Sequence, residues 1–218
     1  FIVGKQRAYY QQLQYNYDYI FSDENFRFSN STDPIERDAL STSDVIEILH
    51  FFKTRNFRDY IMICLLAYTG MRVGGLVSIE IGNIDLKNRT LITQEKPTGF
   101  STGMNLYFIP RKFKIHLESY LLETQTLAPT QQRLFPISTK TVRKQLTKWK
   151  KKHVNPHLFR DALNTRWIEQ GLLDEGIRAI LLNQKPTGIN VKHYVKKYQI
   201  NDKSGKERLK LYDKFFPY

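Results

Sequence analysis

From about residue 40 onward, apolar residues recur at intervals that fit amphipathic helices. Ser41 and Asp44 are three residues apart, the spacing of an N-terminal capping box. Apolar residues then follow at intervals of three and four, at Val45, Ile48, Leu49 and Phe52. A second helix is predicted over 57–68. It is apolar on most sides, which favours a central position, and Gly70 ends it. A third, short helix is predicted after Arg72.

The middle of the chain has a different pattern. Residues 84–93 hold two extended runs around a Lys-Asn-Arg turn, and 105–109 predicts another strand. Between them, Pro97, Gly99 and Gly103 predict a flexible hairpin loop. Further helices are predicted over 110–124, 142–152, 155–170, 173–182, 191–198 and 206–215, with Ser138 capping the second of these and Gly171 ending the third. The pattern predicts a mainly α fold with a small antiparallel β-sheet.

Composition narrows the class of protein. The longest apolar run, 61–68, is too short to span a bilayer, so we expect no membrane partner. The single cysteine, Cys64, lies in that run, which favours core packing and a reducing compartment. The five His and one Cys show no metal-site spacing. The chain begins with Phe1, and we expect it to be a piece of a longer protein.

Charge is distributed unevenly along the sequence. Residues 1–130 contain 14 Lys and Arg against 14 Asp and Glu, whereas residues 131–218 contain 20 against 7. The last stretch therefore carries the entire formal net charge of +13. Such a field attracts a polyanion, because neutralising phosphates releases counterions. A basic surface that serves only solubility is the alternative.

Several residues carry suitable chemistry for a phosphate target, though each is a weak signal singly. Arg72 follows a glycine at a turn, and its fork-shaped side chain suits phosphate. His157 and Arg160 are three residues apart on one predicted helix and share a face. Tyr194 follows Lys-His in a short predicted helix, and Lys96 lies in the hairpin loop.

The order of these residues is more specific than any one of them. An Arg after Thr-Gly, a Lys in a β-hairpin, an H-x-x-R pair and then a Tyr together resemble the catalytic domain of the tyrosine recombinases, the phage integrase family. The resemblance covers about residues 40–215 and leans towards integrases of archaeal viruses and plasmids. It implies that residues 36–218 have the tyrosine recombinase catalytic-domain fold. Residues 1–35 would then be a linker or the remnant of an N-terminal core-binding domain.

The resemblance also implies a mechanism. Arg72 and Arg160 would hold the scissile phosphate, Lys96 would protonate the departing 5′ oxygen, and His157 would handle the proton of the nucleophile. Tyr194 would attack phosphorus and form a 3′-phosphotyrosyl link; Tyr198, one turn later, is the competitor for this role. No metal or other cofactor is implied. The implied partners are a double-stranded DNA attachment site and further copies in a tetramer on DNA, in the host cytoplasm.

The sequence departs from the family pattern at two points. Where the family usually has Leu-Gly-His before the tyrosine, this chain has Leu-Asn-Gln, so Gln184, or Asn183 by spacing, stands in for the histidine. An amide can donate a hydrogen bond but carries no charge, for which Lys185 could compensate. Gly75 stands where an acidic residue commonly follows the first arginine. We therefore expect Arg72 to lack its usual orienting partner.

Two alternatives remain: a catalytically inactive DNA-binding protein of the same fold, and a type IB topoisomerase-like enzyme. The C-terminal helix could dock on a neighbouring protomer or fold back. Phosphate contacts are expected from the basic residues of 144–152 and of the helix after Pro110. These candidates are Arg111, Lys112, Lys114, Lys144, Lys148, Lys150 and Lys151.

Overall fold

The computed structural model describes residues 39–95, 103–184 and 205–216. The chain divides into two units, 1–38 and 39–218, and the first lies outside the described residues. The expected helix at 191–198 and most of the expected hairpin loop also lie outside them. The proposed boundary between a linker and a catalytic domain near residue 35 stays a prediction.

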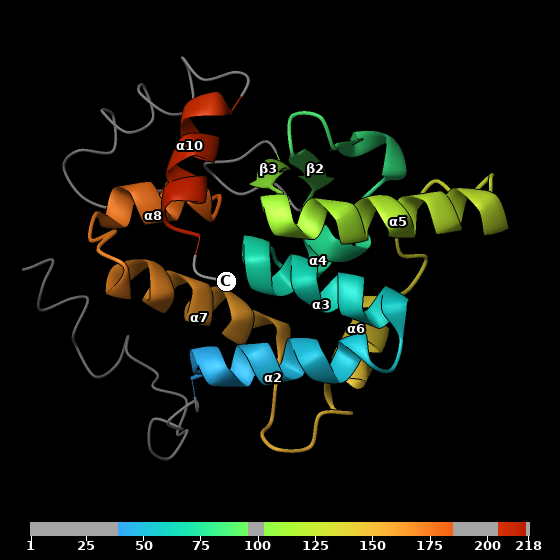
Figure 1. The fold of residues 1–218 in the computed structure, drawn as a ribbon, viewed down its shortest axis with the longest axis horizontal. Helices are drawn as coiled ribbons and strands as arrows, with labels where there is room; N and C mark the ends of the chain where they lie inside the picture. The colour runs from blue at the N-terminus through green and yellow to red at the C-terminus, as the bar shows by residue number, and fades with distance from the viewer. Residues whose placement is uncertain (1–38, 96–102, 185–204, 217–218) are drawn as a thin grey trace, which may run out of the picture. The chain divides into compact units, whose positions relative to one another are not determined.

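The central element is α3 (Phe57–Thr69), whose residues from Asp59 to Ala67 are all buried. It packs against α2 (Thr42–Lys53), α5 (Arg111–Leu127) and α7 (Pro156–Glu169), as Figure 1 shows. The central position expected from its apolar surface is confirmed. Cys64 is fully buried there, and burial raises the pKa of its thiol to about 12.

Local sequence signals set the ends of these helices. Both bonds of the Ser41–Asp44 capping box are present at the start of α2. The Asn155 side chain caps α7, and Pro156 occupies its first turn, where a missing N–H costs nothing. Gly70 ends α3 in the left-handed conformation, with φ of 61°. Each of these ends was expected from the sequence.

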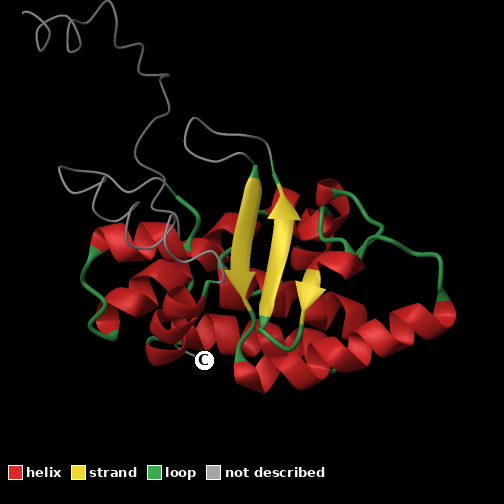
Figure 2. Ribbon diagram, turned by 90° about the horizontal axis from the view of Figure 1, so that it is seen from above, coloured by secondary structure: helices red, strands yellow, loops and turns green. Residues whose placement is uncertain are grey.

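The sheet has three antiparallel strands in the order β1 (Ile84–Asp85), β2 (Thr90–Gln94) and β3 (Met104–Phe108). Its register pairs Thr90 with Phe108 and Gln94 with Met104. Figure 2 shows the strands side by side with helices behind them. The short helices α4 (Val73–Val77) and η1 (Ile81–Asn83) connect α3 to the sheet. The expected mainly α architecture with a small antiparallel sheet is confirmed.

The basic helix is shorter than expected. Ser138 does cap it, but α6 covers only Thr139–Leu146, so the prediction that it extends to residue 152 was wrong. Trp149, which follows the end of this helix, is 4% exposed and belongs to the hydrophobic core.

The last elements are α8 (Glu175–Leu181), capped by Asp174, and α10 (Lys206–Lys214). The α10 helix folds back on its own chain: the Tyr212 hydroxyl donates to the Tyr68 carbonyl oxygen at 2.7 Å, and Arg89 pairs with Asp213 at 2.5 Å. The sequence left open whether this helix docks on a neighbouring protomer or folds back, and the structure shows it folded back. No described helix is both long and apolar enough to cross a membrane.

We predict that Gly70→Ala lowers the free energy of unfolding by about 2–4 kcal/mol, because it combines backbone strain with a clash. A Cβ at Gly70 would lie 2.7 Å from Leu182 Cδ2. Two other glycines separate the strain from the clash. An alanine at Gly171, with φ of 89° and open space around it, would cause strain alone, and an alanine at Gly82 would cause neither. Urea unfolding should rank the losses Gly70, Gly171, Gly82; equal losses would contradict the assigned cause.

Candidate active site

Arg72 lies where the chain turns from α3 into α4, at the N-cap position of α4. Its side chain is 42% exposed, and its Nη1 lies 3.2 Å from Oε2 of Glu95, at the end of β2. The expectation that Gly75 leaves Arg72 without an acidic partner was therefore wrong. A carboxylate reaches Arg72 from the sheet instead of from its own helix.

His157 lies in the first turn of α7, where its backbone N–H donates to the Asn155 side chain. Its ring is 57% exposed, and its Nε2 lies 3.6 Å from Oδ1 of Asp161 on the next turn. The His157 imidazole therefore faces solvent, with the Asp161 carboxylate beside it.

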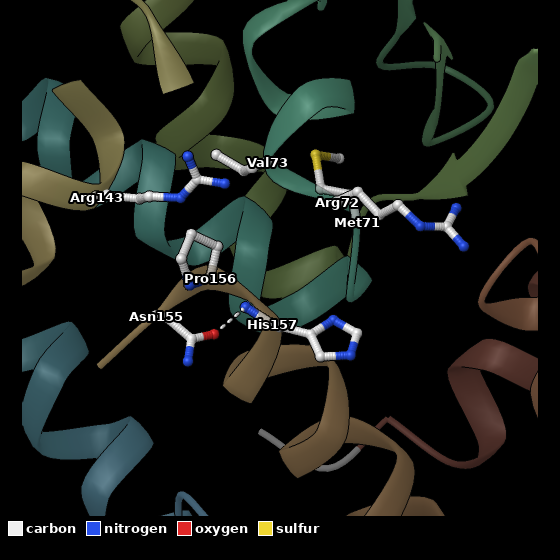
Figure 3. A pocket seen from close by; sticks show the side chains of 7 residues that line it. All are labelled: Met71, Arg72, Val73, Arg143, Asn155, Pro156 and His157. Atoms are coloured by element: carbon white, nitrogen blue, oxygen red, sulfur yellow. Dashed lines mark hydrogen bonds between the residues drawn. The ribbon is translucent and has the colours of Figure 1, made fainter. Parts of the chain in front are cut away.

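Arg72 and His157 line one open pocket of about 340 Å³. Figure 3 shows the Arg72 side chain and the His157 ring extending to the same side, with Arg143 entering from the other end. Arg143, on α6, was not among the residues expected from the sequence. Its neighbour Lys144 was expected to contact DNA. The packing of α6 on α4 shows that Arg143, and not Lys144, lines the pocket. The remaining lining residues are Met71, Val73, Asn155 and Pro156.

Arg160 has a different environment, because its side chain is buried and only 2% of the residue is exposed. Its Nη1 donates to the Gly70 carbonyl oxygen at 2.6 Å and its Nη2 to the Leu182 carbonyl oxygen at 2.5 Å. The guanidinium thus joins the ends of α3 and α8. Burial lowers its pKa from the ordinary value, although an arginine retains its charge in proteins.

The two candidates for the missing histidine have separate positions. The Asn183 side chain donates to the Leu106 carbonyl oxygen on β3 at 2.9 Å. The Gln184 side chain faces Arg160: with its amide oxygen turned to the guanidinium, it accepts from Nη2 at 3.1 Å and from Nε at 3.3 Å. Gln184, rather than Asn183, therefore lies with the arginines.

Two buried groups connect Arg160 with Arg72. The Tyr107 hydroxyl on β3 donates to Oε1 of Glu95 at 2.9 Å, and Arg160 lies close enough to Tyr107 and Glu95 to interact with them electrostatically. Burial and the adjacent Glu95 raise the pKa of Tyr107, so the phenol stays protonated as a donor. The chain of contacts from Arg160 through Tyr107 and Glu95 to Arg72 places both guanidiniums in one cluster.

Four candidates from the sequence fall outside the described residues. They are Lys96, Lys185, Tyr194 and Tyr198.

The seven expected DNA contacts differ in their surroundings. Lys148 and Lys151 form ion pairs with Asp59 and Glu47, and Arg111 lies 3.6 Å from Asp213. Those three charges are partly neutralised within the protein. The other four are Lys112, Lys144 and Lys150, which are exposed, and Lys114, which is half-buried.

Comparison with known proteins identifies the family. The sequence model described as "Phage integrase family" matches residues 38–199. The chain belongs to the phage integrase family. The lean towards archaeal elements stays a prediction, and no curated protein gives a significant match.

Solved structures show the same fold as this family member. The XerA recombinase has a TM-score of 0.59 at 19% identity, with 82% of this chain and 66% of that chain covered. The integrase from mycobacterium phage Brujita has a TM-score of 0.59 at 17% identity, with 86% and 60% covered. The XerH recombinase bound to its difH substrate has 0.56 at 15% identity, with 75% and 51% covered. This chain thus spans less than two thirds of each of these proteins.

The different environments of the two arginines predict effects of different size on stability. Arg160→Lys should lower the free energy of unfolding by about 1–3 kcal/mol, because one ammonium cannot satisfy two buried carbonyl groups in different directions. Arg72→Lys should change it by less than about 0.5 kcal/mol, since the side chain is partly exposed. Urea titration followed by circular dichroism measures both values, and similar losses would contradict a structural role for Arg160.

Proposed function

We propose that this chain is the catalytic domain of a tyrosine-type site-specific DNA recombinase that cleaves and rejoins strands through a 3′-phosphotyrosyl intermediate. The observation that carries the proposal is the convergence of Arg72 and His157 on one pocket, with Arg160 close to the hydrogen-bonded group of Tyr107, Glu95 and Arg72. Family membership and the recombinase fold support it.

The pocket suits a phosphodiester for an electrostatic reason. In the transition state of phosphoryl transfer, negative charge spreads over the non-bridging oxygens, and fixed cations stabilise it most when they are held in place beforehand. Arg72 lines the pocket, and Glu95 engages its Nη1, which leaves other guanidinium donors for a phosphate oxygen. Because Arg160 already donates to two carbonyl groups, it contributes its charge and its remaining donors from behind.

The proposed reaction balances without an external energy source. The Tyr194 oxygen attacks phosphorus while His157 accepts the phenol proton, and a new oxygen–phosphorus bond forms. The bond from phosphorus to the 5′ oxygen breaks, and Lys96 protonates that oxygen. Reversal of these steps with another 5′ hydroxyl rejoins the strand, because the phosphotyrosyl ester retains the energy of the broken ester.

Gln184 in place of the usual histidine changes the donors offered to the phosphate. With its oxygen on Arg160, the amide nitrogen of Gln184 is the group left for a phosphate oxygen. A neutral amide stabilises less charge than an imidazolium would. We therefore propose slower cleavage than in relatives that retain the histidine, and not a loss of cleavage.

The proposed partner is duplex DNA carrying an attachment site, with four protomers assembled on it. XerH is a recombinase whose solved structure contains its difH substrate, and the shared fold is compatible with a similar use of DNA here. Residues 36–218 would form the catalytic domain and residues 1–35 a linker or remnant of a core-binding domain. Contacts limited to this domain should depend steeply on salt.

We predict a covalent protein–DNA adduct when the chain meets nicked duplexes tiled across its source element, because loss of the short fragment traps the ester. Tyr194→Phe should abolish the adduct, whereas Tyr198→Phe should retain it. A denaturing gel with labelled DNA measures this. An adduct that survives Tyr194→Phe but not Tyr198→Phe would contradict the assigned nucleophile.

The same assay separates the alternative functions. DNA binding with no adduct from any duplex would favour the inactive binder. An adduct accompanied by relaxation of supercoiled DNA, without exchange between two sites, would favour the topoisomerase-like enzyme. Joining of strands from two separate sites is the result that the recombinase proposal requires.

Arg143 gives a further prediction, because it adds a second arginine to the lining of the pocket. Arg143→Gln should weaken DNA binding and reduce the slope of log K against log salt by about 1, the effect of one lost phosphate contact. Lys87→Gln removes the same charge from the turn before β2, at the end of the sheet opposite Glu95, and should leave the slope unchanged. Equal slopes for both variants would contradict a phosphate contact by Arg143.

A further inference from the structure

The Glu95 carboxylate is placed between two side chains that use both of its oxygens. Oε2 lies 3.2 Å from Nη1 of Arg72, and Oε1 accepts from the Tyr107 hydroxyl at 2.9 Å. The Glu95 side chain is only 7% exposed, against 42% for Arg72. Its backbone is also held, since its N–H donates to the Gly103 carbonyl oxygen at 2.7 Å. The Glu95 carboxylate is therefore held in place and can position the more exposed Arg72 side chain.

Gly75 is what makes room for this carboxylate. A Cβ at position 75 would lie 2.5 Å from Oε1 of Glu95 and 3.2 Å from its Cδ. Real Cβ atoms do not approach an oxygen so closely, so Gly75 and the observed position of Glu95 depend on each other. Position 75 is also where the family commonly has an acidic residue. In this chain, the Glu95 carboxylate, directly after β2, occupies the space beside position 75.

Tyr107 fixes the orientation of Glu95. It lies on β3, opposite Leu91 of β2, and is 1% exposed. Because its hydroxyl stays protonated, it donates to one carboxylate oxygen and leaves the other for Arg72. A buried carboxylate whose two oxygens both have partners is held in one orientation beside the cation.

We propose that Glu95, which directly follows β2, is the positioning residue for Arg72. It takes the role of the acidic residue that the family commonly has at position 75, where this chain has Gly75 in α4. This proposal rests on the proposed function. Glu95 fixes one edge of the guanidinium, so that the other edge is aligned before a phosphate arrives. Alignment before binding lowers the reorganisation needed in the transition state, which raises the cleavage rate more than it raises DNA affinity.

The test moves the carboxylate between the two positions. Glu95→Gln should slow adduct formation by about 10–100-fold, the usual cost of a misplaced catalytic group, with DNA affinity changed less than about threefold. Gly75→Glu alone should be as slow or slower, because two carboxylates then compete for one space. The double variant Glu95→Ala, Gly75→Glu should recover at least about tenfold over Glu95→Ala, since one carboxylate again lies beside Arg72.

Rescue is the decisive outcome, because a merely structural loss at Glu95 would be worsened by a second substitution in the same region. Glu118→Gln, an exposed acid on α5, is the charge-matched control and should cleave like the wild type. Circular dichroism and urea unfolding identify any variant that does not fold; Tyr107→Phe, which keeps the ring, then serves as the milder probe of the same network. Wild-type rates for Glu95→Gln, or no rescue in a folded double variant, would overturn the proposal.

A second readout does not depend on cleavage. Nitrogen NMR of the arginine side chains should show slowed rotation of the Arg72 guanidinium in the wild type and faster rotation in Glu95→Gln. If the wild type forms no adduct with any DNA, the proposed function fails while this measurement still reports on the contact. If the adduct forms but the Arg72 signal is the same in both proteins, the positioning role fails alone.

Discussion

A buried guanidinium organises the candidate site. Arg160 donates to the carbonyl oxygens of Gly70 and Leu182, so it satisfies backbone groups that two helices leave unpaired at their ends. A cation can remain in such a place only when its donors are satisfied, and the site therefore depends on α3 and α8 ending where they do. Gly70 supplies one of these ends and also turns the chain towards Arg72. The same local geometry thus sets the position of both arginines.

Opposite charges are balanced within the cluster. Glu95 lies between Arg72 and the Tyr107 phenol, and its negative charge favours the charged form of Arg160. Without that carboxylate, the two neighbouring guanidiniums would repel each other. With it, the pocket still has a surplus of positive charge, to which Arg143 adds.

The basic character of the second half of the chain has two uses. Lys148, Lys151 and Lys152 form ion pairs with acidic residues of α2 and α3, so part of the +13 charge stabilises the packing of the chain after α6. The charged side chains that line the pocket face an open cavity instead, where they can contact an anion. The C-terminal helix contributes similarly to cohesion, since Asp213 on α10 pairs with Arg89 beside β2. The net charge of a segment therefore does not by itself locate the surface that meets a polyanion.

Much of the fold and part of the site followed from the sequence, because they depend on local spacing. The Ser41–Asp44 box, the Asn155–Pro156 start of α7 and the glycine after α3 act within a few residues, and the Arg, His-Arg and Tyr motifs are recognised by their order. Contacts between distant segments were decided only by the tertiary structure. These include the ion pair of Arg72 with Glu95, the contact of Gln184 with Arg160, and the position of Arg143 in the pocket. A side chain's partner across the fold depends on how helices and strands pack, and no pattern along one segment encodes that packing.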